Sequence, residues 1–147
     1  MKKVAYINQK IDSFNSKIYV PGDKSLSIRW VLMASQAIGT SVAYNLLKSE
    51  DVFSALKAIK KLGINYKLNK KYCEIYGKGF NGFSFKNNSV IDAGNSGTLA
   101  RLIVGLLINS KKTIILKGDK SLSKRDFSRI IKPMQMFGQN IKSKNSK

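Results

Sequence analysis

Histidine is absent from this chain of 147 residues, and cysteine and tryptophan each occur only once. The absence of histidine excludes histidine-based acid–base catalysis, a Ser-His triad and histidine-ligated metal sites within this chain. The single cysteine, Cys73, excludes an internal disulfide bond and agrees with a reducing compartment. Any chemistry must therefore come from hydroxyl, amide, carboxylate and cationic groups.

Long apolar runs are also missing. The longest, residues 102–108, is too short to cross a membrane, and the apolar residues 4–7 are too few for the core of a signal peptide. We therefore expect a cytoplasmic location. Hydrophobic residues make up 43% of the chain and aromatic residues 10%, values that are typical of a globular domain with a real core.

Acidic residues are scarce: 8 Asp and Glu stand against 27 Lys and Arg, which gives a formal net charge of +19. Such an excess attracts nucleic acids and small anionic substrates alike. The basic residues are scattered, with no block longer than a pair. This distribution favours a solvated basic surface. A basic nucleic-acid-binding fragment is kept as an alternative function.

The most informative stretch is residues 22–29, Gly-Asp-Lys-Ser-Leu-Ser-Ile-Arg, between an expected strand at 18–20 and an expected helix. A turn from a strand into a helix leaves free N–H groups and the positive end of the helix dipole, which favour an anion. Lys24, Ser25 and Arg29 add an ammonium, a hydroxyl and a guanidinium group, the donors that a phosphate or carboxylate needs. An ordinary capped helix with solvated charges is the other interpretation.

Apolar periodicity and turn residues predict alternating strands and helices. Gly39 and Gly63 are expected to end the first two helices, and Ser49 to cap the second. The expected strands are residues 4–7, 18–20, 42–44, 65–68, 72–76, 83–85, 90–92 and 113–117, and the expected helices are 26–38, 50–62, 98–108 and about 127–137.

The chain also contains an internal repeat. Segments 51–63 and 126–138 are offset by 75 residues, and the sequences Gly-Ile-Asn-Tyr-Lys at 63–67 and Gly-Gln-Asn-Ile-Lys at 138–142 keep this offset. We predict a complete β-α-β-α-β-β unit followed by a second, truncated one, since the sequence becomes polar over residues 142–147 where the second hairpin is due. Chance similarity is the alternative for so short a match.

A second glycine-containing turn begins the first helix of the second unit. Gly97 allows a ligand to approach the backbone closely, whereas Asn95 or Ser96 could be a plain N-cap. Arg101, one turn into this apolar helix, needs an anionic ligand or an ion pair, for which Asp92 is a candidate.

A third motif, residues 118–123, repeats residues 22–27 without a change. It falls at a different place in its unit, so the identity reflects either reuse of a good anion-binding turn or coincidence. The basic residues that accompany it, Lys120, Lys124 and Arg125, fit a solvated basic loop equally well.

In order and spacing, the three motifs resemble the N-terminal part of the 5-enolpyruvylshikimate-3-phosphate synthase family. They are Pro-Gly-Asp-Lys-Ser-Leu-Ser-Ile-Arg at 21–29, Asp-Ala-Gly-Asn-Ser-Gly-Thr at 92–98 followed by Arg101, and Gly-Asp at 118–119 followed by Arg125. The resemblance implies the α/β (α+β) fold of the enolpyruvyl transferases, an inverse α/β barrel made of two domains with three repeated units each.

For this chain, the resemblance implies that residues 1–16 are an N-terminal strand and connector that belong with the other domain. Residues 17–147 would form part of the N-terminal domain. Because a third unit is missing, we expect an exposed sheet edge and exposed apolar helix faces.

The implied reaction transfers the carboxyvinyl group of phosphoenolpyruvate to the 5-hydroxyl of shikimate 3-phosphate in the shikimate pathway, without a metal or organic cofactor. Both substrates are small anions, as the residues themselves suggest. The resemblance assigns Lys24, Ser25 and Arg29 to shikimate 3-phosphate, assigns Lys24, Asn95, Gly97 and Arg125 to phosphoenolpyruvate, and gives Arg101 a supporting role.

Family members are about three times longer, and their acid–base residues and remaining substrate contacts lie in sequence absent from this chain. We therefore expect no synthase activity from the chain alone, and the missing C-terminal portion is an expected partner. The UDP-N-acetylglucosamine enolpyruvyl transferase shares the fold and is the alternative relative, although the spacing of Lys24, Ser25 and Arg29 fits the shikimate enzyme better.

Overall fold

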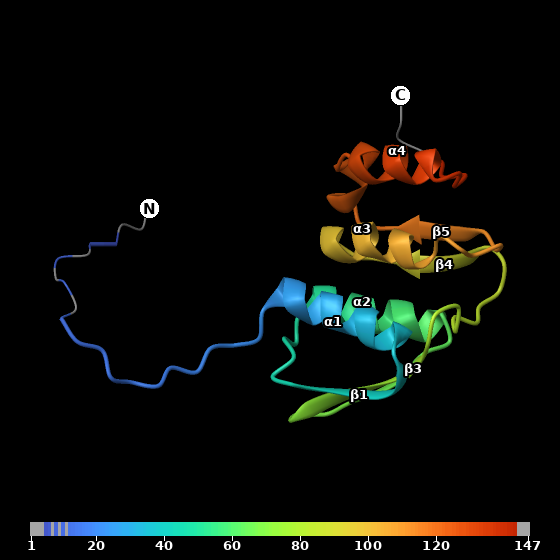
Figure 1. Cartoon of the computed structure of the whole chain (residues 1–147). Helices are drawn as coiled ribbons and strands as arrows, with labels where there is room; N and C mark the ends of the chain where they lie inside the picture. Colours follow the sequence, from blue (N-terminus) through green and yellow to red (C-terminus); the bar gives the residue numbers. More distant parts are fainter. Residues whose placement is uncertain (1–4, 7, 9, 11, 144–147) are drawn as a thin grey trace.

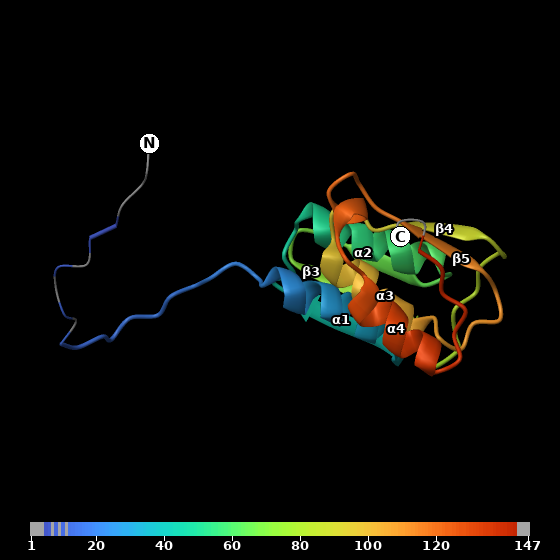
Figure 2. The ribbon, with the colours of Figure 1, turned by 90° about the horizontal axis from the view of Figure 1, so that it is seen from above.

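The computed structural model describes residues 5, 6, 8, 10 and 12–143. Residues 12–20 contain no helix or strand and extend away from a folded body (Figures 1 and 2). The helices are α1 (Lys24–Gln36), α2 (Glu50–Lys61), α3 (Gly97–Leu106) and α4 (Ser128–Met136), with a 3-10 turn η1 (Leu122–Lys124). The strands are β1 (Ile38–Tyr44), β2 (Asn65–Leu68), β3 (Tyr72–Lys78), β4 (Ser89–Asp92) and β5 (Ile114–Lys117).

The body is layered. An antiparallel sheet in the order β1-β3-β2 packs against α1 and α2, and on the far side of these helices lie α3 and the parallel pair β4–β5, with α4 outermost (Figure 1). Alternation along β3 turns Cys73 and Ile75 into the core, where burial raises the pKa of the Cys73 thiol to about 11. The arrangement agrees with the expected α/β fold of repeated units.

One hydrophobic core joins the two units. Its fully buried side chains include Ile28 and Val31 of α1, Leu56 of α2, and Leu99 and Ile103 of α3. Burial of a side chain of this size contributes about 1.5–3 kcal/mol. The core therefore fixes the three helices relative to one another, and with them the positions of their first turns.

The internal repeat is visible in the backbone. The second helix of each unit ends at Lys61 and at Met136, which are 75 residues apart. Two residues beyond each end, Gly63 and Gly138 both have a positive φ, of 88° and 82°. This left-handed conformation is the usual helix-stop geometry of glycine, so the matching sequences give matching helix ends.

Two expected strands do not form. Residues 18–20 are exposed, and no strand among the described residues pairs with them. The side-chain amide of Asn45 donates to the carbonyl of Val20 over 3.2 Å. Residues 83–85 are irregular, and the N–H of Ser84 donates to the carbonyl of Leu62 over 2.8 Å. Of the strand expected at 4–7, residues 4 and 7 lie outside the described part of the chain.

The first helix begins and ends two residues earlier than expected, at 24–36 in place of 26–38. It ends at Gln36, and Ala37 already has an extended conformation, so that Gly39 lies inside β1 with a φ of 92° instead of ending the helix. Ser49 occupies the N-cap position of α2, but its side chain makes no capping hydrogen bond there.

The second unit leaves apolar surface uncovered, as expected. Helix α4 buries none of its residues, and both Met136 at its end and the following Phe137 are largely exposed. Within the described part of this unit, the sheet consists of two strands. Within the described residues, no helix is both long and apolar enough to cross a membrane.

Candidate anion-binding site

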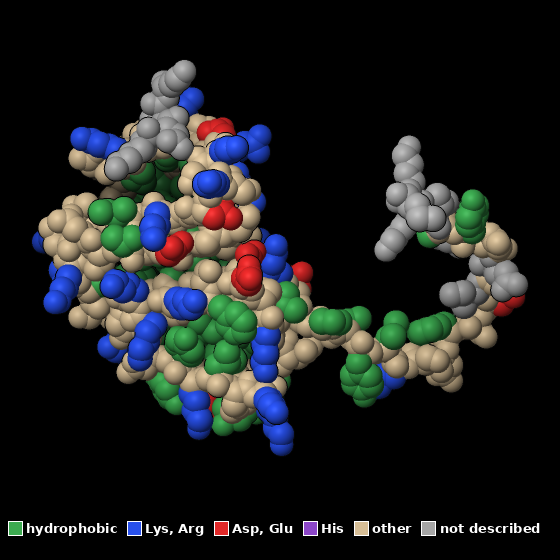
Figure 3. Space-filling model, turned by 180° about the vertical axis from the view of Figure 1, so that it is seen from behind, with side chains coloured by type: hydrophobic (Ala, Val, Ile, Leu, Met, Phe, Trp, Pro, Cys, Tyr) green, Lys and Arg blue, Asp and Glu red, His purple; other side chains and the backbone are tan. Residues whose placement is uncertain are grey.

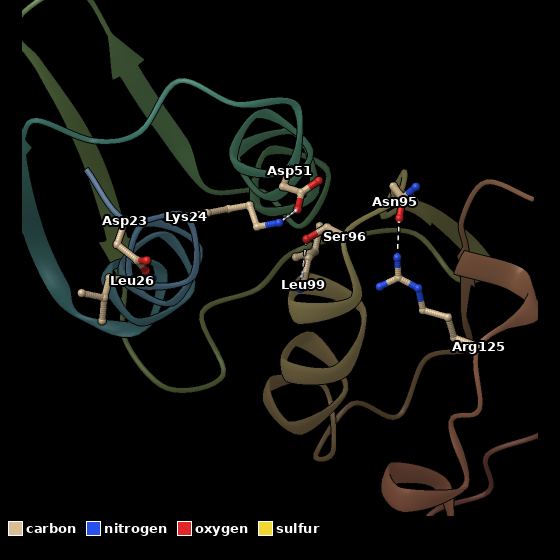
Figure 4. Close-up of polar contacts among 8 residues, drawn as sticks. All are labelled: Asp23, Lys24, Leu26, Asp51, Asn95, Ser96, Leu99 and Arg125. Carbon is tan, nitrogen blue, oxygen red and sulfur yellow. Dashed lines mark hydrogen bonds and ion pairs between the residues drawn. The ribbon is translucent and has the colours of Figure 1, made fainter. Parts of the chain in front are cut away.

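Three helices begin at one cavity of about 380 Å³. Its lining includes Lys24, the first residue of α1, and Asp51, in the first turn of α2 (Figure 4). Gly97, the first residue of α3, also belongs to the lining. Asn95, Thr98, Arg101 and Arg125 complete the lining. The start of a helix presents unpaired N–H groups and the positive end of the helix dipole, so the convergence of three such ends favours an anion.

The start of α1 is fixed by a tight contact with the loop that follows β1. The carboxylate of Asp23 accepts a hydrogen bond of 2.6 Å from the N–H of Leu26 and so caps the helix. A Cβ atom on Gly22 would collide with the carbonyl oxygen of Asn45. Only glycine allows this approach, which brings the first turn of α1 beside the segment that leads into α2.

Lys24 and Asp51 form an ion pair across the cavity, with 3.2 Å between Nζ and Oδ2. The side chain of Asp51 is 20% exposed and that of Lys24 is 53% exposed. Along the sequence, Asp51 is simply an acidic residue in the first turn of a helix. The sequence gives no sign of this pairing, because the two residues come together only when the chain returns through β1 and α2 packs beside α1.

Arg125 reaches the cavity from the segment after η1. Its Nη2 donates a 2.6 Å hydrogen bond to Oδ1 of Asn95 (Figure 4). The turn that precedes it is anchored twice: the N–H of Asp119 donates to the carbonyl of Gly94 over 2.9 Å, and Leu122 is buried. The third motif therefore docks on the second one and carries Arg125 to it.

The two identical hexapeptides adopt the same capped turn. Asp119 accepts a hydrogen bond of 2.7 Å from the N–H of Leu122, as Asp23 does from the residue three positions on. The first copy continues into α1, whereas the second ends after η1. Of the two equivalent lysines, Lys24 lines the cavity and Lys120 does not.

Gly97 leaves room for two guanidinium groups. A Cβ atom at this position would lie 2.8 Å from Nη1 of Arg125 and 3.0 Å from Nη1 of Arg101. Arg101 lies over the ring of Phe127 at 5.2 Å, and its Nη2 donates to the carbonyl of Asp126 over 3.4 Å. These contacts hold Arg101 against the segment that follows Arg125.

Asp92 is not the partner of Arg101. It forms an ion pair of 3.0 Å with Lys117 and accepts a 2.9 Å hydrogen bond from the N–H of Gly94. The Gly94 N–H first, and Lys117 second, hold the pKa of this carboxyl below its ordinary value. The cavity itself is therefore lined by three cationic side chains and, among the residues that the structure describes, by the single carboxylate of Asp51.

The structure brings together Lys24, Asn95, Gly97, Arg101 and Arg125. It does not bring Ser25 or Arg29 to the same cavity: Ser25 is half-buried and Arg29 is exposed on α1. The N-cap of α3 is Ser96, whose hydroxyl accepts from the N–H of Leu99 over 3.3 Å, which leaves the side chain of Asn95 for Arg125.

A larger hollow of about 480 Å³ lies between the loop after β1 and the turn before β3, and it contains none of the expected substrate-binding residues. On the face seen in Figure 3, Lys and Arg side chains are spread widely with a few acidic groups among them. This scatter agrees with a solvated basic surface.

A family model for EPSP synthase (3-phosphoshikimate 1-carboxyvinyltransferase) matches residues 8–147. The chain is 36% identical over 140 residues to the 3-phosphoshikimate 1-carboxyvinyltransferase of Syntrophomonas wolfei, which covers 95% of this chain and 32% of the relative. It is 39% identical over 142 residues to the protein of that name from Ruthia magnifica, which covers 97% of this chain and again 32% of the relative.

A solved structure of EPSP synthase from Acinetobacter baumannii superimposes with a TM-score of 0.80 at 37% identity, over 86% of this chain and 28% of that one. The chain thus spans about a third of the length of the curated relatives it matches. Over that third, sequence and fold agree: the chain belongs to the EPSP synthase family.

Proposed function

We propose that this chain supplies the phosphoenolpyruvate side of the site for the reaction implied by its family. In that reaction the carboxyvinyl group of phosphoenolpyruvate passes to the 5-hydroxyl of shikimate 3-phosphate by addition, followed by elimination of phosphate. The observation that supports the proposal is the cavity at which three helices begin and which Lys24, Arg101 and Arg125 line. Such a site suits a small ligand with both phosphate and carboxylate groups.

Each expected residue takes a role in this proposal. Lys24 contacts both substrates, Gly97 and Arg125 bind phosphoenolpyruvate together with Asn95, and Arg101 supports Arg125 from behind. Ser25 and Arg29, which lie outside the cavity, bind the phosphate side of shikimate 3-phosphate. The acid–base groups come from the part of a longer family member that lies outside the region matched by this chain.

The proposal includes the domain arrangement and the location. Residues 17–147 form part of the N-terminal domain, and residues 1–16 associate with the second domain of a longer protein. The missing C-terminal portion is then a partner of this chain. A cytoplasmic location is part of the same proposal.

Ligand titration tests the assignment. Phosphoenolpyruvate, shikimate 3-phosphate, UDP-N-acetylglucosamine and a single-stranded oligonucleotide are titrated into the full chain by calorimetry at two salt concentrations. We expect weak binding of the first two ligands, and about tenfold weaker binding of phosphoenolpyruvate by Arg125→Ala. Lys124→Ala, which removes the neighbouring exposed cation outside the cavity, is the matched control and leaves this affinity nearly unchanged.

A different outcome would favour another function. Steeply salt-dependent oligonucleotide binding, without a preference for either phosphorylated metabolite, would assign the chain to nucleic-acid binding. A preference for UDP-N-acetylglucosamine would assign it to the related transferase. A coupled phosphate-release assay is expected to detect no turnover by the chain alone, and turnover would contradict the division of the site between two portions.

A further inference from the structure

Asp51 stands out among the residues of the cavity because it repels the ligand that the other residues attract. It is the carboxylate in the lining, it is mostly buried, and its Oδ2 lies 3.2 Å from Nζ of Lys24. A carboxylate in a cationic cavity occupies the lysine that an anionic ligand also needs. The inference that follows rests on the proposed anion-binding function of this cavity.

We infer that Asp51 is an internal competitor for Lys24: it positions the ammonium group in the cavity, and an incoming anion must displace it. Asp51 then sets the affinity of the site. The ion pair holds the ammonium group of Lys24 in the cavity, and the negative charge of Asp51 weakens the binding of every anion that contacts Lys24. Asp51 is thus a positioning residue with an electrostatic cost, rather than a group that binds the ligand.

A purely structural role for Asp51 at the start of α2 accounts for less of the geometry. The first turn of α2 contains a second acidic residue, Glu50, which is exposed and also interacts favourably with the helix dipole. The helix therefore does not depend on Asp51 alone for an acidic first turn. What Asp51 has and Glu50 lacks is a position in the cavity lining and a short contact with Lys24.

The test uses inorganic phosphate as the probe and compares the full chain with Asp51→Asn. Asp92→Asn is the matched control, because it removes one charge from the other ion pair, with Lys117, which lies outside the cavity. We expect Asp51→Asn to bind phosphate on the order of tenfold more tightly and Asp92→Asn to bind it as the parent chain does. Asp51→Glu, which restores the charge, should return the affinity toward that of the parent.

Two further measurements separate competition from a general effect of charge. In a Lys24→Gln background, Asp51→Asn should gain at most about twofold in phosphate affinity, because the competition has no target. In NMR spectra of the ligand-free chain, the side-chain ammonium signal of Lys24 should shift in Asp51→Asn and stay in place in Asp92→Asn.

The outcomes are distinguishable. Unchanged or weaker phosphate binding by Asp51→Asn, or an equal gain in the Lys24→Gln background, would overturn the inference. If neither the parent chain nor any variant binds phosphate, the proposed function fails, and the competition fails with it. The Lys24 signal then decides only whether Asp51 positions Lys24: a shift confined to Asp51→Asn supports this, and no shift refutes it.

Discussion

Arg125 and Asn95 are joined by a hydrogen bond of 2.6 Å between Nη2 and Oδ1, although they lie 30 positions apart in the sequence. The bond connects the segment after η1 to the turn before α3. It satisfies one arm of the guanidinium group and leaves the others free to bind a ligand in the cavity. The relationship places an amide, rather than a carboxylate, beside the arginine, so its positive charge stays available.

Replacing Asn95 by Ala should therefore weaken the binding of phosphoenolpyruvate about fivefold, equivalent to about 1 kcal/mol, because Arg125 loses its orientation. Calorimetric titration measures the effect. Asn87→Ala is the control, since Asn87 also bridges two segments, by accepting from the N–H of Thr113, but lies outside the cavity. Equal affinities for the two variants would show that the Asn95 contact does not orient Arg125.

Replacing Gly97 by Ala should weaken ligand binding without much effect on the stability of the fold. The added Cβ meets the flexible ends of Arg101 and Arg125, so the fold tolerates it while both guanidinium groups are pushed away. We expect phosphoenolpyruvate binding to fall about tenfold with little loss of stability. Gly105→Ala, in the same helix with open space at its Cβ, should instead raise stability by about 0.5–1 kcal/mol and leave binding unchanged. Urea unfolding and titration test the pair together.

The capped turn of the second hexapeptide should contribute measurably to the free energy of unfolding. Asp119→Ala removes the hydrogen bond to the N–H of Leu122 and should cost about 1 kcal/mol in the free energy of unfolding. Asp23→Ala removes the equivalent bond at α1 and should cost a similar amount. Asp12→Ala, in the exposed N-terminal extension, is the control and should cost nothing. Stability as low in the control as in the cap variants would argue against both caps.

The ionisation of Asp92 should make the free energy of unfolding depend on pH. The N–H of Gly94 and the ammonium of Lys117 hold its pKa below the ordinary value in the folded chain, so the folded state favours the charged form. The stabilisation is present above the unfolded pKa and is lost as the pH falls below about 4 toward the folded pKa, because the unfolded chain then binds more protons. Urea unfolding at pH 6 and pH 3 should show a smaller loss in Asp92→Asn than in the parent chain, and equal losses would contradict this assignment.

The sequence was sufficient to find the residues that lie in local motifs. Asn95 and Gly97 stand in one glycine-containing turn, Lys24 begins a helix directly after another, and Arg125 follows a copy of the same hexapeptide. Helix ends in the repeat could be predicted as well, because Gly63 and Gly138 act locally through a positive φ. These signals need no knowledge of the tertiary structure.

What the sequence did not reveal depends on contacts between distant segments. In the sequence, Asp51 is an ordinary acidic residue in the first turn of a helix, and only the packing of α2 beside α1 gives it a lysine partner. The apolar residues 18–20 have a strand pattern, but a strand requires a neighbouring strand for its backbone hydrogen bonds, and no strand that the structure describes pairs with them. Local pattern decides a turn, whereas pairing decides a strand.

The common origin of α1, α2 and α3 at one cavity also means that these neighbouring helices point the same way (Figure 1). Like poles then stand side by side, an arrangement that is electrostatically unfavourable in itself. A negative ion between the poles relieves the repulsion. Anion binding would therefore also stabilise the folded state of this family member, because the three helices repel one another less when an anion lies between their first turns.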